Sequence, residues 1–200
     1  MAMESEDVTA QSKAVVDIIK NCTFGAIDDK VETLPTFDIE YMFLRIRSKS
    51  VGETVELIIT CQDDGETKVP VNINLEDINV VKTEGHDTTI MITDKIGLTM
   101  RYPTMKQLMS YDMSKITTME GTFKVINDCL ENVFDENEVY EEMNSKELQE
   151  FIEQMTTEQF QKVSEFFNTM PKLKHTLKVK NPNTGVENEV VLEGMQSFLE

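Results

Sequence analysis

The sequence predicts an α+β protein with a small antiparallel sheet, a helical region after it and a β-hairpin at the C-terminal end. Apolar and polar residues alternate between about residues 51 and 102, which is typical of strands. Between 104 and 170 the apolar residues follow the period of a helix. After Pro171, two further alternating runs flank NPNTG, and strand runs followed by helical runs are typical of α+β folds.

We expect four consecutive segments in this chain of 200 residues. The first segment should hold a helix over 5–20. The four segments are a helical arm and linker over 1–30, an α+β region with the antiparallel sheet over 31–103, a helical region over 104–170, and the C-terminal hairpin with a short helix over 171–200.

The stretch TFDIEYMFLRIRSKS fits a strand by its alternation and a helix by its spacing. We predict a helix over 36–48, because Thr36 or Asp38 can cap its start and the basic residues near its end suit the helix dipole. Gly52 follows the end, as is usual after a helix. Apolar residues lie nearly all round this helix, so we expect it to be central and well buried.

The predicted sheet begins with VELIITC and TKVPVNINL, which read as a hairpin around the polar turn QDDGE. Pro70 cannot donate a backbone hydrogen bond, so the second strand should lie at a sheet edge. The runs INVVKT, TTIMITD and IGLTMRY should complete the same small sheet, with the 36–48 helix against one face.

The helical region should begin with helices over 104–111 and 119–133, the second running on toward Phe134. Asn144 with Glu147, and Thr156 with Gln159, match or approximate capping boxes. They predict two further helices with facing apolar stripes, which end at Pro171.

The C-terminal runs HTLKVK and VENEVVL should pair around NPNTG, where Gly185 supplies the positive φ that the turn needs. The tail GMQSFLE should form a last helical turn with three apolar residues on one side, Met195, Phe198 and Leu199.

The formal net charge is −18, which repels phosphate backbones and anionic lipid. We therefore expect neither nucleic acid nor a membrane as partner, and no apolar run is long enough to span a bilayer. The negative charge has two interpretations: it attracts a basic protein partner, or it only keeps the protein soluble. The polar start is unlike a secretory signal, and three scattered cysteines fit a reducing cytoplasm.

The sequence offers little catalytic or metal-binding chemistry. Cys61 would begin a zinc knuckle, but Asp64 stands where a second cysteine is needed and His86 is the only nearby candidate ligand. Neither His86 nor His175 lies in a recognisable nucleophile motif. We therefore expect no enzyme activity, no cofactor and no metal, with a free thiol at Cys61.

Four segments carry a resemblance to a known family: PTFDIEYMFLRIRSKSVGE, VELIITC, IGLTMRYP and MPKLKHTLKVKNPNTG…VVLEGMQSF. The chain resembles the baseplate hub subunit family of T-even-type (myovirus) contractile-tailed bacteriophages from about Cys22 to the end. The resemblance implies a non-enzymatic part in building the baseplate hub. It implies other baseplate or tail proteins as partners, and a location in the host cytoplasm during assembly or in the tail baseplate of the virion.

Two other functions stay open at this point: a transient assembly chaperone absent from the virion, and a small metal-binding or enzymatic protein that uses Cys61 and a histidine. The oligomeric state is not predicted. The C-terminal stretch is expected to dock another tail protein, although its apolar residues can equally serve the chain's own core and its lysines can protect a strand edge. The expected interface residues are Phe166, Phe167, Lys174, Lys178, Met195, Phe198 and Leu199.

Overall fold

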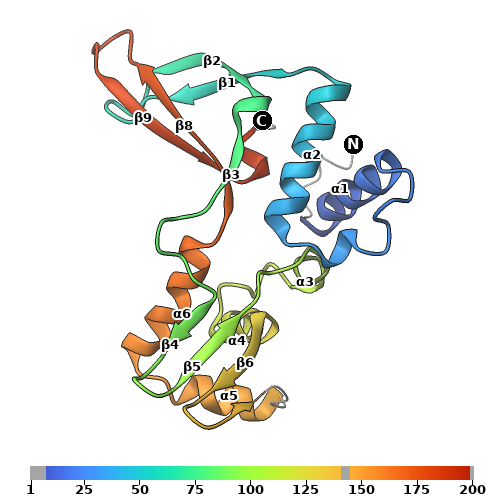
Figure 1. The fold of residues 1–200 in the computed structure, drawn as a ribbon. Coiled ribbons are helices and arrows are strands. Elements are labelled where there is room, and N and C mark those ends of the chain that lie inside the picture. The colour runs from blue at the N-terminus through green and yellow to red at the C-terminus, as the bar shows by residue number, and fades with distance from the viewer. Residues whose placement is uncertain (1–7, 141–144, 199–200) are drawn as a thin grey trace. The chain divides into compact units, whose positions relative to one another are not determined.

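The computed structural model describes residues 8–140 and 145–198, and Figure 1 shows the fold. The chain is α+β and all its strand pairings are antiparallel within these ranges, which confirms the predicted class. None of the helices in the described ranges has the length and apolar character that crossing a bilayer requires. The α-helices are α1 (Val8–Cys22), α2 (Thr36–Ser50), α3 (Met105–Ser110), α4 (Met119–Cys129), α5 (Ser145–Glu153) and α6 (Thr157–Thr169).

The strands are β1 (Thr54–Thr60), β2 (Lys68–Asn74), β3 (Asn79–Val81), β4 (Thr89–Met91), β5 (Gly97–Met100), β6 (Leu130–Phe134), β7 (Val139–Tyr140), β8 (Lys172–Lys180) and β9 (Glu187–Glu193). They form three sheets in the described ranges, with strand orders β1-β2, β3-β8-β9 and β4-β5-β6-β7. Short 3₁₀ turns lie at Val31–Thr33 (η1), Leu75–Asp77 (η2) and Met195–Phe198 (η3).

The chain folds into two compact units, each assembled from segments that are distant in sequence. The first unit combines Lys82–Met170 with Glu32–Thr36 and the chain up to Ala14. The second combines Val15–Val31, Phe37–Val81 and Pro171–Glu200. These units therefore group the chain differently from the four consecutive segments that the sequence suggests.

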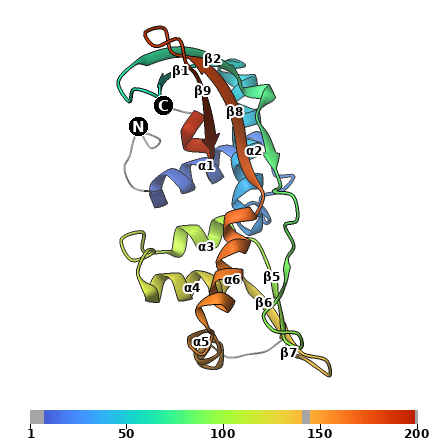
Figure 2. The ribbon, with the colours of Figure 1, turned by 90° about the vertical axis from the view of Figure 1, so that its left-hand side faces the viewer.

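The first unit is a four-stranded sheet with helices on one side, as Figure 2 shows for α4 and α6. Its buried core includes Leu98 of β5, Val133 of β6 and Val163 of α6. The capping box of α6 is present as predicted: Thr156 N–H donates to Gln159 Oε1 at 2.8 Å, and Gln159 N–H donates to Thr156 Oγ1. The equivalent prediction at Asn144 lies outside the described residues.

The second unit joins two hairpins, and Leu44 of α2 packs into their common core. The predicted β1–β2 hairpin is present, with limits within one residue of those expected, and Pro70 lies opposite Ile58 in a two-stranded sheet where every strand is an edge. The terminal hairpin β8–β9 is also confirmed, and Gly185 in its turn has a φ of +76°. Helix α2 buries mainly one face, with Ile39, Phe43 and Leu44, so it is less enclosed than predicted.

Two sequence predictions are wrong in detail. The strands between residues 51 and 102 do not form one sheet, because β3 pairs with β8 and β5 pairs with β6. The helix predicted over 119–133 ends at Cys129, and Leu130–Phe134 is a strand. Pairing with β5 explains the second error: the register shifts between Thr99 and Met100, so Leu130 and Val133 are both buried although they are three residues apart.

Candidate protein-interaction site

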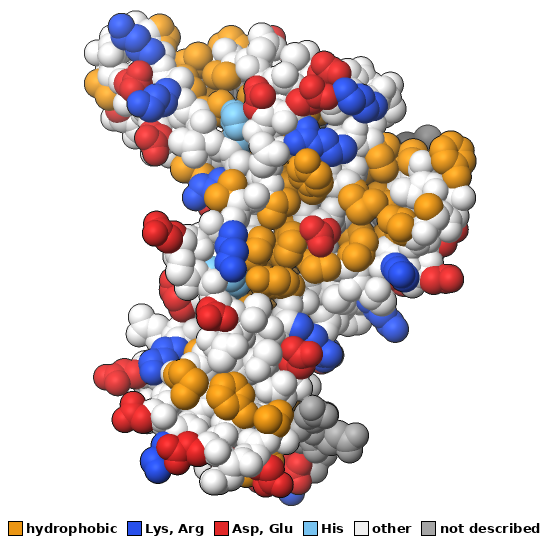
Figure 3. Space-filling model, viewed as in Figure 1, with side chains coloured by type: hydrophobic (Ala, Val, Ile, Leu, Met, Phe, Trp, Pro, Cys, Tyr) orange, Lys and Arg blue, Asp and Glu red, His pale blue; other side chains and the backbone are white. Residues whose placement is uncertain are grey.

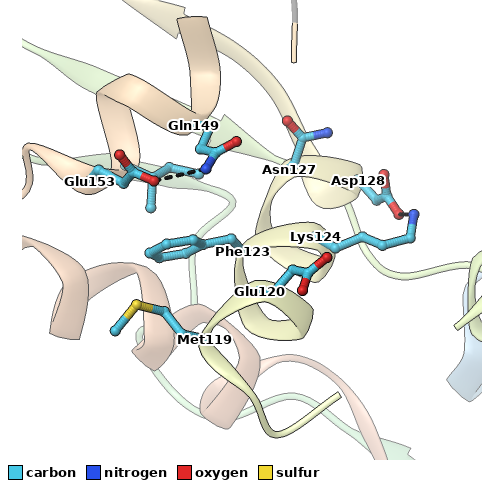
Figure 4. Close-up of a pocket in the computed structure, with 9 residues that line it drawn as sticks. Met119, Glu120, Phe123, Lys124, Asn127, Asp128, Gln149 and Glu153 are labelled. Carbon is cyan, nitrogen blue, oxygen red and sulfur yellow. Dashed lines mark hydrogen bonds and ion pairs between the residues drawn. The ribbon is translucent and has the colours of Figure 1, made fainter. Parts of the chain in front are cut away.

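An open groove lies between α4 and α5 of the first unit (Figure 4). Its volume is about 610 Å³, and the lining residues within 8–140 and 145–198 all come from these two helices. The lining residues are Met119, Glu120, Phe123, Lys124, Asn127, Asp128, Gln149, Ile152 and Glu153.

The apolar part of the groove follows from helical spacing. Met119 and Phe123 are four residues apart on α4 and therefore lie on the same face, one turn from each other. The Phe123 ring meets the Phe160 ring edge-on, with centroids 6.4 Å apart, and Ile152 of α5 is almost fully buried. The Met119 side chain, by contrast, is 75% exposed. The groove thus has an ordered apolar floor and a flexible apolar side chain at one end.

The rim of the groove is acidic. The lining carries three negative charges and one positive charge, from Glu120, Asp128, Glu153 and Lys124. Lys124 is paired with Asp128 at 3.1 Å. The amide of Gln149 donates to Glu153 at 2.8 Å, as Figure 4 shows.

A second polar cluster joins the turns of the two hairpins in the second unit. We call it the turn network, and its members are Asp63, Asp64, Asn181, Thr184 and Asn188. Asn181 Nδ2 donates to Asp63 Oδ1 at 3.0 Å and to Asp64 Oδ2 at 2.9 Å. Asn188 Nδ2 donates to Asp63 Oδ1 at 2.9 Å, while Asn188 Oδ1 accepts from the backbone N–H of Asp63 at 3.0 Å. Thr184 Oγ1 donates to Asp63 Oδ2.

These hydrogen bonds favour the ionised carboxylates. The bond from Asn181 is the first cause that holds the pKa of Asp63 below its usual value, followed by the bond from Thr184. The pKa of Asp64 is lowered chiefly by the hydroxyl and backbone N–H of Thr67. Both carboxylates are bonded to side chains of the other hairpin, so the turn network ties the two turns together.

The two lysines among the expected interface residues are paired within the hairpin. Lys174 lies 3.5 Å from Glu193, and Lys178 lies 3.4 Å from Glu187, across the β8–β9 ladder. Figure 3 shows basic and acidic side chains close together over this hairpin, at the upper left. Opposite charges on facing strands stabilise the pairing of β8 with β9. The net attraction of these lysines for an acidic partner is correspondingly reduced.

The apolar residues expected at the interface lie mostly in the two cores. Phe166 is 3% exposed in the first unit, where its ring stacks on Tyr102, and Phe167 packs edge-on against Phe166. Phe198 is fully buried in the second unit and Met195 is nearly so. The remaining expected residue, Leu199, lies outside the described residues.

Cys61 and His86 belong to different units and both are buried. The pKa of the Cys61 thiol is raised by burial and by the nearby carboxylates, so the thiol form is favoured. His86 Nδ1 lies 2.9 Å from Thr169 Oγ1 and His86 Nε2 lies 3.1 Å from the Tyr102 hydroxyl, so both ring nitrogens have partners. Within the described ranges, no group of three or more His, Cys, Asp or Glu side chains is arranged to hold a metal ion.

Comparison with protein-family models gives one decisive match. A model described as T4 bacteriophage base plate protein matches residues 1–200, which is the whole chain. The chain belongs to this T4 baseplate family. Comparisons with curated proteins and with solved structures gave no match.

Membership in the T4 baseplate family confirms the phage baseplate part of the resemblance seen in the sequence. It indicates a structural or assembly role at the virion tail, among other tail and baseplate proteins. It also suggests a non-enzymatic role. These statements hold for a T4-type baseplate protein in general, and they do not distinguish the hub from other parts of the baseplate.

Sequence reasoning missed both clusters of this baseplate protein. The groove needs α4 and α5 to lie side by side, which the sequence does not state, although the helical spacing of Met119 and Phe123 is visible. The turn network had a clearer signal, because QDDGE and NPNTG are both turn sequences rich in side chains that hydrogen-bond locally. Nothing in the sequence indicates that these two turns meet.

Proposed function

We propose that this protein is a component of the phage baseplate hub and acts through contacts with other tail proteins. Three of the four segments that resemble the hub subunit family fall in the second unit. They correspond to α2, to β1 and to the terminal hairpin with η3. The fourth, IGLTMRYP, corresponds to β5 in the first unit.

The turn network is the observation that carries this proposal. The carboxylates of Asp63 and Asp64 accept hydrogen bonds from side chains of the other hairpin, and they fasten one hairpin to the other. Side chains used in this way fix the relative positions of two hairpins, which suits a part that must hold its shape in a large assembly. An enzyme would need such groups to face a substrate.

The terminal hairpin remains the part of the second unit that we expect to contact another tail protein. Among the described strands β9 pairs with β8 alone, so its other edge can accept an added strand. Lys174 and Lys178 lie on this hairpin, whereas Phe198 and Met195 support it from the core. In this proposal the buried residues position the surface and do not touch the partner.

A second candidate is a transient assembly chaperone that is absent from the mature virion. The open groove of the first unit favours it, because Met119 exposes apolar surface that could shelter an aggregation-prone segment. The two candidates differ in one observable, the copy number of the protein in purified virions.

A phage with a stop codon in this gene tests the hub proposal. We expect cells infected by it to accumulate incomplete baseplates and no functional tails, and we expect the wild-type gene on a plasmid to restore tails. Electron microscopy of the lysates is the measurement. Normal tails and normal infectivity without the protein would contradict the proposal.

A further inference from the structure

The groove between α4 and α5 has features of a helix-binding site. The described residues that line it all come from two helices, and none of them belongs to a strand whose edge an extended peptide could join. Its polar amides are Asn127 and Gln149, and Gln149 is already bonded to Glu153. Such a lining gives little directional recognition of a small molecule, whereas apolar side chains of a helix can enter a groove of this kind.

The negative charge of the rim favours a positively charged partner. Lys124 is paired with Asp128 at 3.1 Å, so the one cation among the described lining residues already has an anionic neighbour. Glu120 makes no ion pair among the described residues, and it stands beside the exposed Met119 at the start of α4. The whole chain has a formal net charge of −18, which adds to the attraction for a cation and repels an anionic partner at long range.

We propose that this groove binds a basic amphipathic helix of another protein. Apolar side chains of that helix pack on Phe123, Ile152 and Met119, and its lysines or arginines face Glu120 and Glu153. Helix α4 has 11 residues. At about 1.5 Å per residue this gives a floor roughly 16 Å long, enough for about three turns of partner helix with anchors at i, i+3 or i+4, and i+7.

A basic helix bound in the groove is one specific kind of partner and goes beyond the hub proposal. It holds for a lasting neighbour in the baseplate and equally for a client during assembly. The binding measurement below uses the purified protein alone. Failure of the groove proposal can therefore be distinguished from failure of the hub proposal, which is judged on phage tails.

The test uses fluorescently labelled synthetic peptides and the full-length protein. The first peptide is a helix of leucine and lysine with all leucines on one face. The second has the same composition in an order that destroys the two faces, and the third has glutamate in place of lysine. Fluorescence anisotropy is measured at about 0.15 M salt, where long-range attraction is screened. We expect the first peptide to bind and the other two to bind at least about tenfold more weakly, because the apolar face supplies anchors.

Two variants locate the binding. Met119→Asp places a charge at the exposed apolar end of the groove. The double variant Glu120→Lys/Glu153→Lys reverses the charge of the rim. Each variant should weaken the binding of the first peptide by about tenfold or more. The matched control, Glu66→Lys/Glu84→Lys, makes the same change of net charge at exposed positions outside the groove and should bind like the wild type. Circular dichroism checks that each variant is folded.

Several results would overturn the proposal. Equal binding of the two lysine peptides, or equal loss in the control variant, would mean that net charge alone attracts the peptide. Absence of binding by the first peptide would reject a basic helix as occupant. A dimer in analytical ultracentrifugation that is lost in Met119→Asp would assign the groove to a second copy of this chain.

Discussion

The side-chain amide of Asn181 donates hydrogen bonds to both carboxylate oxygens of Asp63, at 3.0 and 3.2 Å, across a separation of 118 residues. Asp63 lies in the β1–β2 turn and Asn181 begins the β8–β9 turn. Charge-assisted hydrogen bonds of this kind are stronger than bonds between neutral groups. The pair therefore makes the two hairpins of the second unit depend on each other.

Replacement of Asp63 by alanine should loosen both turns together. The substitution removes the acceptor for Asn181, Thr184 and Asn188 at once. We expect faster amide hydrogen exchange in the segments 61–68 and 181–187, measured by mass spectrometry, with β5 and β6 unchanged. The control is Asp29→Ala, at an exposed position in a loop of the same unit. Exchange that is unchanged in one of the two turns would show that they are not coupled.

The same two carboxylates should make the second unit less stable in acid. The pKa values of Asp63 and Asp64 are below their usual values in the folded protein. A lowered folded pKa means that the stabilisation is present above the unfolded pKa and is lost as the pH falls through the folded one. We expect the turn network to be intact near neutral pH and to open in strongly acidic solution, and the double variant Asp63→Ala/Asp64→Ala should lack this acid transition in hydrogen exchange.

Glu40 should make the stability of the folded protein depend on pH in the opposite direction. Burial raises its pKa from 4.5 to about 7, although a hydrogen bond from the Met195 backbone opposes the shift. A raised folded pKa means that the stabilisation is complete below the unfolded pKa and is lost as the pH rises through about 7. The loss is at most about 3.5 kcal/mol, at about 1.4 kcal/mol per pKa unit.

The variant Glu40→Gln tests this dependence because glutamine stays neutral at every pH. Thermal unfolding of the wild type should move to lower temperature between about pH 5.5 and about pH 8, while the variant should change less. Equal shifts in the two proteins would show that Glu40 does not keep its proton near neutral pH.

Gly97 and Phe134 form a matched pair in the first unit. They face each other in the β5–β6 ladder, and a Cβ atom added to Gly97 would lie 2.2 Å from Cζ of the Phe134 ring. Gly97→Ala should therefore destabilise the protein by about 1–3 kcal/mol through overpacking. Adding Phe134→Leu should recover part of the loss. Denaturant unfolding of the single and double variants measures the coupling, and strictly additive effects would contradict it.

The sequence predicted the features that local signals determine. Thr156 with Gln159 is a capping box, and NPNTG is a turn, because in each case the interacting groups are within a few residues of one another. Local spacing predicts a helix over Leu130–Phe134, where the structure has a strand, since this strand depends on β5 about 33 residues earlier. The turn network and the α4–α5 groove were missed for the same reason. Each joins short segments whose pairing is set by packing at a distance.

The burial of Phe198 leads to a further stability prediction. This side chain is fully buried in the core of the second unit, together with Leu173 and Val179 of β8. Phe198→Ala should cost about 3–5 kcal/mol, whereas Val191→Ala at an exposed position of β9 should cost about 0.5 kcal/mol or less. Truncation after Pro171 removes all three core residues and should unfold the second unit. A truncated chain with native hydrogen-exchange protection in β1 and β2 would show that the hairpin is dispensable for folding.

The most direct test of the proposed function is quantitative mass spectrometry of purified virions and of baseplates isolated from them. A component of the baseplate hub should be present at a fixed, low copy number per particle and should remain with the baseplate fraction after the rest of the tail is removed. Its absence from virions, in phage whose infected cells contain the protein, would contradict a place in the hub and would favour a transient chaperone.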